Sequence, residues 1–411
     1  MIKGKAVSWQ CSQEMMKFKF ILILFFLTSG HLFSQPFQVG RASITFIDSS
    51  RNNRNIPAEV YYPADMAGEN VPISSVNNLK FPVLSFGHGF LMTWDSYMNI
   101  WDAVVPEGFI IVFPRTETGF TPSHNEFGKD LAFLLSEMVA LGNDNTSFLF
   151  NRVDTMNCVM GHSMGGGAAF LAAEFSPIIK TIVTFAPAET NPSAIQAAAN
   201  LNIPALIFAG SNDCVTPPLT NQKPIYDALQ SECKSYISII GGSHCQMADN
   251  NFFCSFGEGT CTPPPAISRA EQHTIINRYL LSWLNSQLKD DCFSGAQFDS
   301  LIISDSGISF QKSCELCNTN SILDNNSNIS IEIFPNPFHD SIYFQCSIFA
   351  NSEVGIDLYL LNGTKIHSQT FSNVQPDEKL RLEVNQHVAS GIYLLKLTID
   401  GQEIVRKIVK E

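Results

Sequence analysis

Between residues 36 and 288, short runs of consecutive apolar residues alternate with longer stretches in which apolar residues recur every three or four positions. Runs that are apolar on both faces are typical of strands inside a mostly parallel sheet, and the longer period is typical of amphipathic helices. The strand-like runs are FPVLSFGHG, GFIIVFP, NCVMGHS, TIVTFAP, PALIFAG and SYISIIGG, preceded by ASITFID and AEVYYP, which predict an antiparallel opening. This order predicts an α/β domain over residues 35–288, with an open sheet flanked by helices.

The pattern changes after residue 288. Residues 289–328 are rich in Ser, Asn and Asp, a composition that predicts a linker. From residue 329 to residue 411, apolar and polar residues alternate with a period of two, and turn dipeptides such as Asn362-Gly363 separate the runs. This second region is predicted to form a small antiparallel β-sandwich.

The N-terminal residues 1–34 have the layout of a secretory signal peptide. Two lysines precede an apolar run from Phe20 to Leu27, and small and polar residues follow; the start is expected at Met15 or Met16. The run is too short for a permanent membrane anchor, and no later segment is long and apolar enough to span a bilayer. We therefore expect an exported, soluble protein.

Charge and cysteine content narrow the possible functions. A net charge of −13 argues against a nucleic-acid partner. Eleven cysteines in an exported chain predict several disulfides. Their spacing does not determine the pairing, although we expect Cys254 and Cys261 to close the segment CSFGEGTC, and Cys158 to be a buried thiol. CELC, from Cys314 to Cys317, lacks a second pair at zinc-finger spacing, so no metal is expected.

The segment from Gly161 to Gly165, GHSMG, is a G-x-S-x-G sequence between a predicted strand and a predicted helix. Residues without Cβ atoms let a strand and a helix approach closely around a serine, and the helix N-terminus directs free N–H groups at the same centre. In this strand–turn–helix context, the sequence predicts a nucleophile at Ser163.

A serine hydroxyl is a weak nucleophile without a base, which in this fold class follows the serine and an acid along the chain. His244 lies on a glycine-rich loop directly after a predicted strand, whereas His273 lies within a predicted helix, so His244 is the predicted base. Asp213 follows the strand PALIFAG and is the favoured orienting carboxylate, with Glu189 as the alternative.

An acyl-transfer site also needs N–H donors for the oxyanion. One is expected at Met164, the residue after the nucleophile, and the other at Phe90 in the loop SFGHGFLMTW. His88 in the same loop is expected to make only a structural hydrogen bond.

Residues from about 38 to 288 resemble the α/β-hydrolase superfamily, in the branch of chlorophyllase-like, dienelactone-hydrolase-like and cutinase-like polyester hydrolases. The resemblance lies in FPVLSFGHGF, GHSMGGGAAF, ALIFAGSNDCVTPP and GGSHCQMA. It implies Ser163 as nucleophile, Asp213 as acid, His244 as base, and Phe90 and Met164 as oxyanion donors, with no cofactor. The chain departs from its polyester-degrading relatives in two ways: Ala188 and His162 stand where those relatives often have tryptophan.

Residues from 329 to 411 resemble the C-terminal sorting domain of the type IX secretion system, through IFPNPFHDSIYF, IDLYLLNGTKI and SGIYLLKLTIDGQEIVRKIVK. The resemblance implies export through the periplasm to the cell surface or medium, with the translocon as a partner. A β-sandwich that binds carbohydrate or protein is the alternative.

These features together predict a secreted serine carboxylic-ester hydrolase that acts through an acyl-enzyme on a small-molecule, lipid or polyester substrate. A serine amidase or peptidase on the same scaffold, and a non-catalytic surface binding protein, are the alternatives. The sequence does not name the acyl or alcohol part of the substrate.

Overall fold

The computed structural model describes residues 37–317, 331–346, 352–360, 363–376, 378–384, 388–399 and 402–411. The predicted signal peptide, residues 1–34, and the end of the predicted linker, residues 318–328, lie outside the described residues. No helix in the described ranges is long and apolar enough to cross a membrane.

The α/β domain is built on a ten-stranded sheet with the strand order β10-β9-β8-β7-β6-β4-β5-β2-β1-β3. Its strands are β1 (Gln38–Asp48), β2 (Arg54–Ala64), β3 (Gly68–Glu69), β4 (Phe81–Gly87), β5 (Ile110–Pro114), β6 (Val153–His162), β7 (Thr181–Phe185), β8 (Ala205–Gly210), β9 (Lys234–Ile239) and β10 (Ile308–Lys312). Strands β4 to β9 are parallel neighbours. The pairs β1–β2, β2–β5 and β9–β10 are antiparallel, and the short β3 pairs parallel with β1. The predicted antiparallel opening and mostly parallel centre are confirmed.

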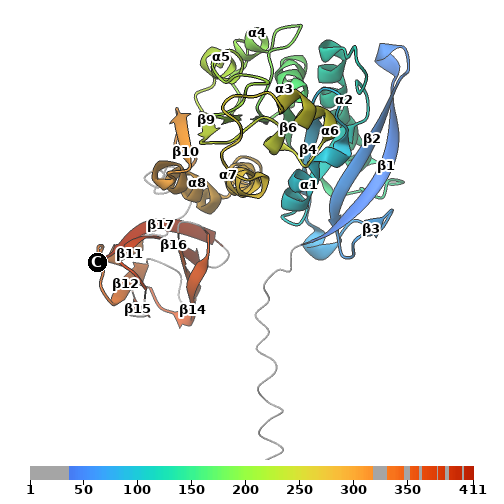
Figure 1. The fold of residues 1–411 in the computed structure, drawn as a ribbon. Helices are drawn as coiled ribbons and strands as arrows, with labels where there is room; N and C mark the ends of the chain where they lie inside the picture. Colours follow the sequence, from blue (N-terminus) through green and yellow to red (C-terminus); the bar gives the residue numbers. More distant parts are fainter. Residues whose placement is uncertain are drawn as a thin grey trace, which may run out of the picture. The chain divides into compact units, whose positions relative to one another are not determined.

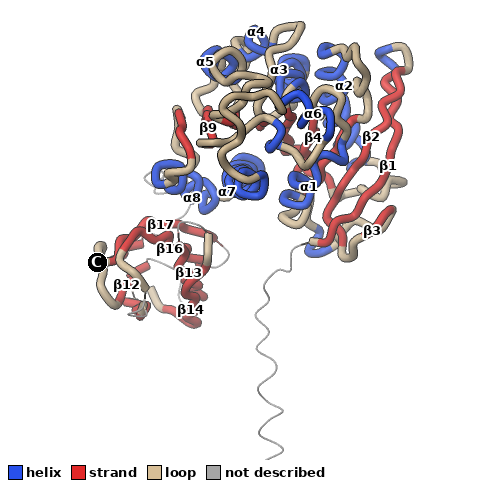
Figure 2. The backbone as a smooth tube through the Cα atoms, in the orientation of Figure 1, coloured by secondary structure: helices blue, strands red, loops and turns tan. Residues whose placement is uncertain are grey.

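Helices lie on both faces of this sheet, as Figures 1 and 2 show. The α-helices are α1 (Met98–Val104), α2 (His124–Asn143), α3 (Met164–Phe175), α4 (Ala194–Ala198), α5 (Gln222–Ala228), α6 (Phe252–Glu258), α7 (Arg269–Lys289) and α8 (Cys292–Ser304). Short 3-10 helices are η1 (Ser49–Arg51), η2 (Val76–Asn78), η3 (Trp94–Tyr97) and η4 (Cys245–Met247). The two longest helices begin with a serine cap followed three residues later by glutamate, Ser123 in α2 and Ser268 in α7.

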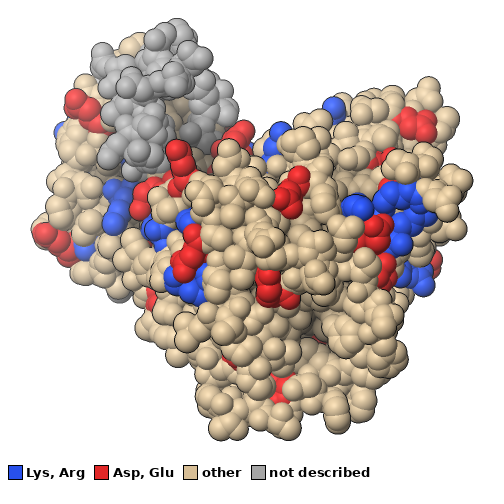
Figure 3. Space-filling model, turned by 90° about the horizontal axis from the view of Figure 1, so that it is seen from above, with Lys and Arg blue, Asp and Glu red and all other residues tan. Residues whose placement is uncertain are grey.

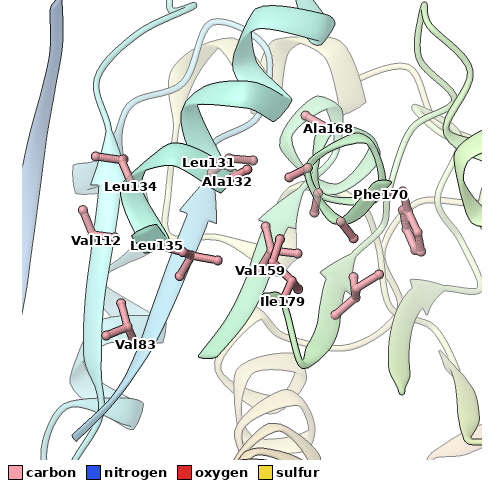
Figure 4. Close-up of a cluster of buried hydrophobic side chains, with 14 of the residues drawn as sticks. Val83, Val112, Leu131, Ala132, Leu134, Leu135, Val159, Ala168, Phe170 and Ile179 are labelled. Atoms are coloured by element: carbon pink, nitrogen blue, oxygen red, sulfur yellow. The ribbon is translucent and has the colours of Figure 1, made fainter. Parts of the chain in front are cut away.

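Successive residues of the central strands enter different hydrophobic cores, because side chains alternate across a strand. In β6, Val159 belongs to the core under α2, α3, α4 and α5, and Met160 to the core under α1, α7 and α8. Figure 4 shows the first core, in which α2 and α3 pack onto β4, β5 and β6. Burial on both faces is the reason that these strands are continuous apolar runs in the sequence.

The α/β domain continues beyond residue 288, into the stretch expected to be a linker. Residues 292–304 form α8, and β10 pairs antiparallel with β9 at the edge of the sheet. Polar residues that indicated a linker have structural roles here: the Asp291 side chain caps α8 by accepting from the N–H groups of Phe293 and Ser294. The disulfide Cys233–Cys314 links the end of this region to the residue before β9, and Cys292–Cys317 links the start of α8 to the residues after β10.

The C-terminal region forms two antiparallel sheets, which confirms the predicted sandwich-like architecture. The three-stranded sheet has the order β11-β12-β15 and the four-stranded sheet the order β14-β13-β16-β17. These strands are β11 (Ile331–Phe334), β12 (Ser341–Cys346), β13 (Ser352–Leu360), β14 (Lys365–Val374), β15 (Lys379–Glu383), β16 (Gly391–Ile399) and β17 (Gln402–Lys410). Buried residues from both sheets share one core, including Phe344, Leu358, Leu382 and Leu395.

On the face drawn in Figure 3, acidic and basic side chains are interspersed and wide areas carry neither. Low surface charge agrees with a composition of only 15% charged residues. The described part of this face has no continuous basic area of the kind that binds a phosphate backbone.

The packing of α2 on the sheet generates a stability prediction. Leu134 is completely buried in the core of Figure 4, so Leu134→Ala should lower the free energy of unfolding of the α/β domain by about 2–5 kcal/mol. The matched control is Leu219→Ala, because Leu219 is 82% exposed and its truncation should change stability by less than about 0.5 kcal/mol. Urea unfolding of both variants measures the difference, and equal effects would contradict the packing.

Candidate active site

Ser163 lies in a sharp turn between the end of β6 and the start of α3. Its backbone has φ 55° and ψ −121°, a combination that residues with a Cβ atom rarely adopt. The Ser163 N–H donates to the carbonyl of Phe185, and its own carbonyl accepts from the N–H groups of Gly167 and Ala188. These hydrogen bonds hold the strained turn, and the side chain remains 8% exposed at the carboxyl end of the sheet.

Close packing between main chains enforces this turn. A Cβ atom at Gly161 would lie 2.3 Å from the carbonyl oxygen of Gly165, and one at Gly165 would lie 2.1 Å from the carbonyl oxygen of Gly87. Both distances are far inside van der Waals contact, so β4, β6 and α3 meet only because all three positions lack side chains. The glycines around Ser163 therefore allow the main chains to approach closely, and the left-handed conformation is that of Ser163 itself.

His244 and Asp213, which lie on the loops after β9 and β8, are hydrogen-bonded to each other. The His244 Nδ1 atom lies 2.8 Å from Oδ2 of Asp213, and both side chains are almost completely buried. The other carboxylate oxygen, Oδ1, accepts from the N–H groups of Val215 and Thr216, at 2.9 and 2.8 Å. With Nδ1 engaged by the carboxylate, Nε2 is the ring nitrogen of His244 that remains for a proton transfer.

Thr216 and Gln222 extend this hydrogen-bond network. The Thr216 Oγ1 atom lies 2.9 Å from Oδ2 of Asp213 and 3.0 Å from Nδ1 of His244. The Gln222 Nε2 group donates to Oγ1 of Thr216 and to the carbonyl oxygen of Pro187. Neither residue was singled out from the sequence, although Thr216 stands only three positions after Asp213 in the same loop.

Two backbone N–H groups that the sequence predicts as oxyanion donors have no acceptor in the part of the chain that the structure describes. One belongs to Met164, the first residue of α3, and the other to Phe90, in the turn after β4. The first N–H groups of a helix never have an intrahelical partner. In the Phe90 turn, by contrast, the neighbouring Gly89 N–H donates to the hydroxyl of Tyr97 at 2.7 Å. The two predicted oxyanion donors are thus available for a ligand.

His162 is completely buried between Tyr97 and His244. Its Nδ1 atom lies 3.0 Å from the Tyr97 hydroxyl, and its ring centre lies 4.7 Å from that of His244. Burial holds the pKa of His162 well below 6.5, and the neighbouring His244 lowers it further. His162 is therefore neutral at physiological pH.

The other residues weighed from the sequence lie elsewhere. Glu189 accepts from the N–H of Ile195 at the start of α4, so Asp213 and not Glu189 contacts His244. His273 lies on α7 with Nε2 3.2 Å from the carbonyl oxygen of Ala248. Both ring nitrogens of His88 lie within 2.9 Å of main-chain carbonyl oxygens, an arrangement typical of a structural histidine.

Disulfides follow directly after both Asp213 and His244. Cys214, next to Asp213, is bonded to Cys261, and Cys245, next to His244, is bonded to Cys254. The expected Cys254–Cys261 pairing is therefore wrong, because each of these cysteines reaches back to a different loop of the site. The 47-residue separation of Cys214 and Cys261 gives a loop-closure stabilisation of about 4 kcal/mol. Cys158 is a buried free thiol, as predicted.

Comparison with known proteins agrees with this geometry. Residues 38–298 match the family model described as PET hydrolase-like. The chain belongs to this family. Residues 332–411 match the model described as a secretion system C-terminal sorting domain, which confirms the predicted sorting domain and indicates a secreted or cell-surface protein.

Among curated relatives, Cutinase 2 of Thermobifida cellulosilytica is 25% identical over 187 residues, which is 45% of this chain and 64% of that protein. Cutinase cut1 of Thermobifida fusca is 25% identical over 187 residues, 45% of this chain and 52% of that protein. A bis(hydroxyethyl) terephthalate hydrolase of Streptomyces coelicolor is 22% identical over 234 residues, 56% of this chain and 62% of that protein. The chain thus spans between about half and two thirds of the length of these relatives.

The buried histidines generate a prediction about pH. Burial lowers the pKa of His88 and His162 in the folded protein, whereas the same side chains titrate near 6.5 when the chain is unfolded. Below pH 6.5 the unfolded state therefore binds more protons, and stability should fall as the pH drops, by up to about 1.4 kcal/mol per pH unit for each histidine. Urea unfolding between about pH 7.5 and 5 measures this dependence, and constant stability over the range would contradict it.

Proposed function

We propose that this protein is a secreted serine carboxylic-ester hydrolase with Ser163 as nucleophile, His244 as base and Asp213 as the orienting acid. The observation that carries the proposal is the 2.8 Å hydrogen bond between the buried His244 and Asp213 side chains, on loops that follow neighbouring parallel strands. In open α/β sheets, reacting groups gather beyond the carboxyl ends of the strands. Ser163 follows β6 at the same edge, in the conformation that a nucleophile elbow requires.

The reaction proceeds through an acyl-enzyme. His244 Nε2 accepts the hydroxyl proton as Ser163 Oγ attacks the ester carbonyl, and Asp213 stabilises the resulting imidazolium through Nδ1–H. The N–H groups of Phe90 and Met164 donate to the oxyanion of the tetrahedral intermediate. His244 then returns its proton to the leaving alcohol, and a water molecule deprotonated by His244 hydrolyses the acyl-serine to release the acid.

The neutral His162 suits this mechanism, because a second imidazolium beside His244 would oppose the charge that His244 gains. The oxyanion donors differ in how they are held: Met164 belongs to a helix terminus, whereas Phe90 belongs to a short turn.

We propose esters, including those in polyesters, as the substrate class. The support is the relatives, which are named as cutinases and as a bis(hydroxyethyl) terephthalate hydrolase. An amidase or peptidase activity on the same scaffold, and a purely binding role, predict different outcomes of the assays below. The sorting domain supports the type IX translocon as the export partner.

The central variant is Ser163→Ala. With p-nitrophenyl acetate, butyrate and laurate as substrates, it should lower kcat by roughly 10³- to 10⁶-fold, since only binding and the oxyanion donors remain. The matched control is Ser235→Ala, because the buried Ser235 hydroxyl has no hydrogen-bond partner among the described residues and its loss should leave turnover unchanged. Ester hydrolysis that survives Ser163→Ala would contradict the proposal, and turnover of p-nitroanilides alone would favour the amidase.

Thr216→Val tests whether the Thr216 hydroxyl supports Asp213 as the orienting acid. The substitution keeps the side-chain shape but removes the hydroxyl that lies 2.9 Å from the Asp213 carboxylate, and one hydrogen bond to a charged group corresponds to about a 10- to 100-fold loss of kcat/KM. Thr184→Val is the control, because the buried Thr184 hydroxyl has no partner in the described ranges. Equal kcat/KM values for the two variants would show that Thr216 does not support the acid.

A further inference from the structure

Tyr97, at the end of η3, is a completely buried tyrosine whose hydroxyl has three polar neighbours. The hydroxyl oxygen lies 2.7 Å from the N–H of Gly89, 3.0 Å from Nδ1 of His162 and 3.4 Å from the sulfur of Met92. Tyr97 has no part in the proposed mechanism.

The directions of these hydrogen bonds follow from the chemistry of the groups. The Gly89 amide can only donate, so the Tyr97 oxygen accepts from it. The hydroxyl proton then goes to His162 Nδ1, because an imidazole nitrogen is a much stronger acceptor than the thioether sulfur of Met92. With Nδ1 as acceptor, the single ring proton of the neutral His162 is on Nε2.

Burial agrees with this assignment. The Tyr97 phenol keeps its proton, because burial raises its pKa far above the ordinary value. The His162 imidazole stays neutral, because burial lowers its pKa. Each hydrogen bond of the chain from Gly89 through Tyr97 to His162 therefore has one donor and one acceptor over the whole physiological range of pH.

The turn held by Tyr97 carries the proposed oxyanion donor. The carbonyl of Gly89 accepts from the N–H of Met92 at 3.0 Å, and Leu91 has a positive φ of 55°. Both polar main-chain groups of Gly89 are thus engaged: the N–H donates to Tyr97, and the carbonyl contacts the N–H of Met92 and, at 2.9 Å, Nδ1 of His88. The peptide plane that contains the Gly89 carbonyl also presents the N–H of Phe90, which has no acceptor among the described residues.

We propose that Tyr97 is a positioning residue for the oxyanion hole: its hydroxyl, directed by His162, holds the Gly89 amide so that the adjacent Phe90 N–H faces the reacting carbonyl. The proposal rests on the proposed function, since it assigns Phe90 to the oxyanion. His162 links this turn to the base, because the same ring that accepts from Tyr97 packs against the His244 ring.

Tyr97→Phe removes only the hydroxyl. Since displacement of a reacting group by about 1 Å can lower a rate 10²-fold, we expect kcat for p-nitrophenyl butyrate to fall by about 10- to 100-fold, with KM within about threefold of the wild type. A trifluoromethyl ketone, which forms an oxyanion on the serine, should bind more weakly by the same factor as kcat.

The matched control is Tyr62→Phe. Tyr62 is also completely buried, and its hydroxyl donates to a main-chain carbonyl, that of Val71, at 2.7 Å. Both variants should lose similar stability, but Tyr62→Phe should keep kcat and ketone affinity. Equal kcat values for the two variants would overturn the positioning role.

Two variants of His162 test whether the Tyr97 hydroxyl must donate its proton to residue 162. His162→Asn keeps an acceptor oxygen close to the position of Nδ1, whereas His162→Leu removes the acceptor with similar bulk. We expect the asparagine variant to retain most of the ketone affinity and the leucine variant to fall to the level of Tyr97→Phe. Equal ketone affinity in both variants would overturn the role of His162.

The outcomes separate this proposal from the proposed function. Ester hydrolysis that persists in Ser163→Ala would refute the serine mechanism itself. Serine-dependent hydrolysis that is unchanged in Tyr97→Phe would refute only the positioning of the oxyanion donor.

Discussion

Main-chain atoms of β4, β6 and α3 meet at a point where no side chain fits. A Cβ atom on Gly165 would lie 2.1 Å from the carbonyl oxygen of Gly87, and one on Gly161 would lie 2.3 Å from that of Gly165. Because the helix begins so close to the strand that precedes it, the connecting residue, Ser163, must turn sharply and adopts a positive φ. The same contact brings the loop after β4 beside the N-terminus of α3. The proposed nucleophile and both proposed oxyanion donors therefore depend on one steric constraint.

Two hydrogen-bond networks meet at His244. On the acid side, Gln222 and Thr216 hold Asp213, which contacts Nδ1 of the imidazole. On the other side, the ring of His162 packs against the same imidazole and contacts Tyr97, whose hydroxyl accepts from the turn that carries Phe90. The His162 side is neutral, because burial holds the pKa of His162 well below its ordinary value. Disulfides at Cys214 and Cys245 fasten the loops on which the acid and the base lie.

Local patterns were sufficient to predict the sheet and to place Asp213 and His244 on loops that bring them into contact. Strands β4 to β9 are buried on both faces and therefore appear as apolar runs, and Asp213 and His244 each directly follow such a run. Contacts between distant loops were not predictable. The Tyr97 and His162 side chains are 65 residues apart, and a tyrosine within a short helix carries no pattern that marks its partner. The predicted Cys254–Cys261 disulfide was wrong for the same reason, since the true partners lie on distant loops. Helix α8 was not predicted because polar residues that cap a helix, such as Asp291, resemble those of a linker.

The central claim, that Ser163 is the nucleophile activated by His244, is tested most directly by locating the covalent adduct. Diethyl p-nitrophenyl phosphate phosphorylates activated serines, so the wild type should gain one diethylphosphoryl group per chain, on the peptide that contains Ser163, as its esterase activity disappears. His244→Ala should react far more slowly while the protein remains folded. An adduct on a different residue, or full inhibition without modification of Ser163, would contradict the account.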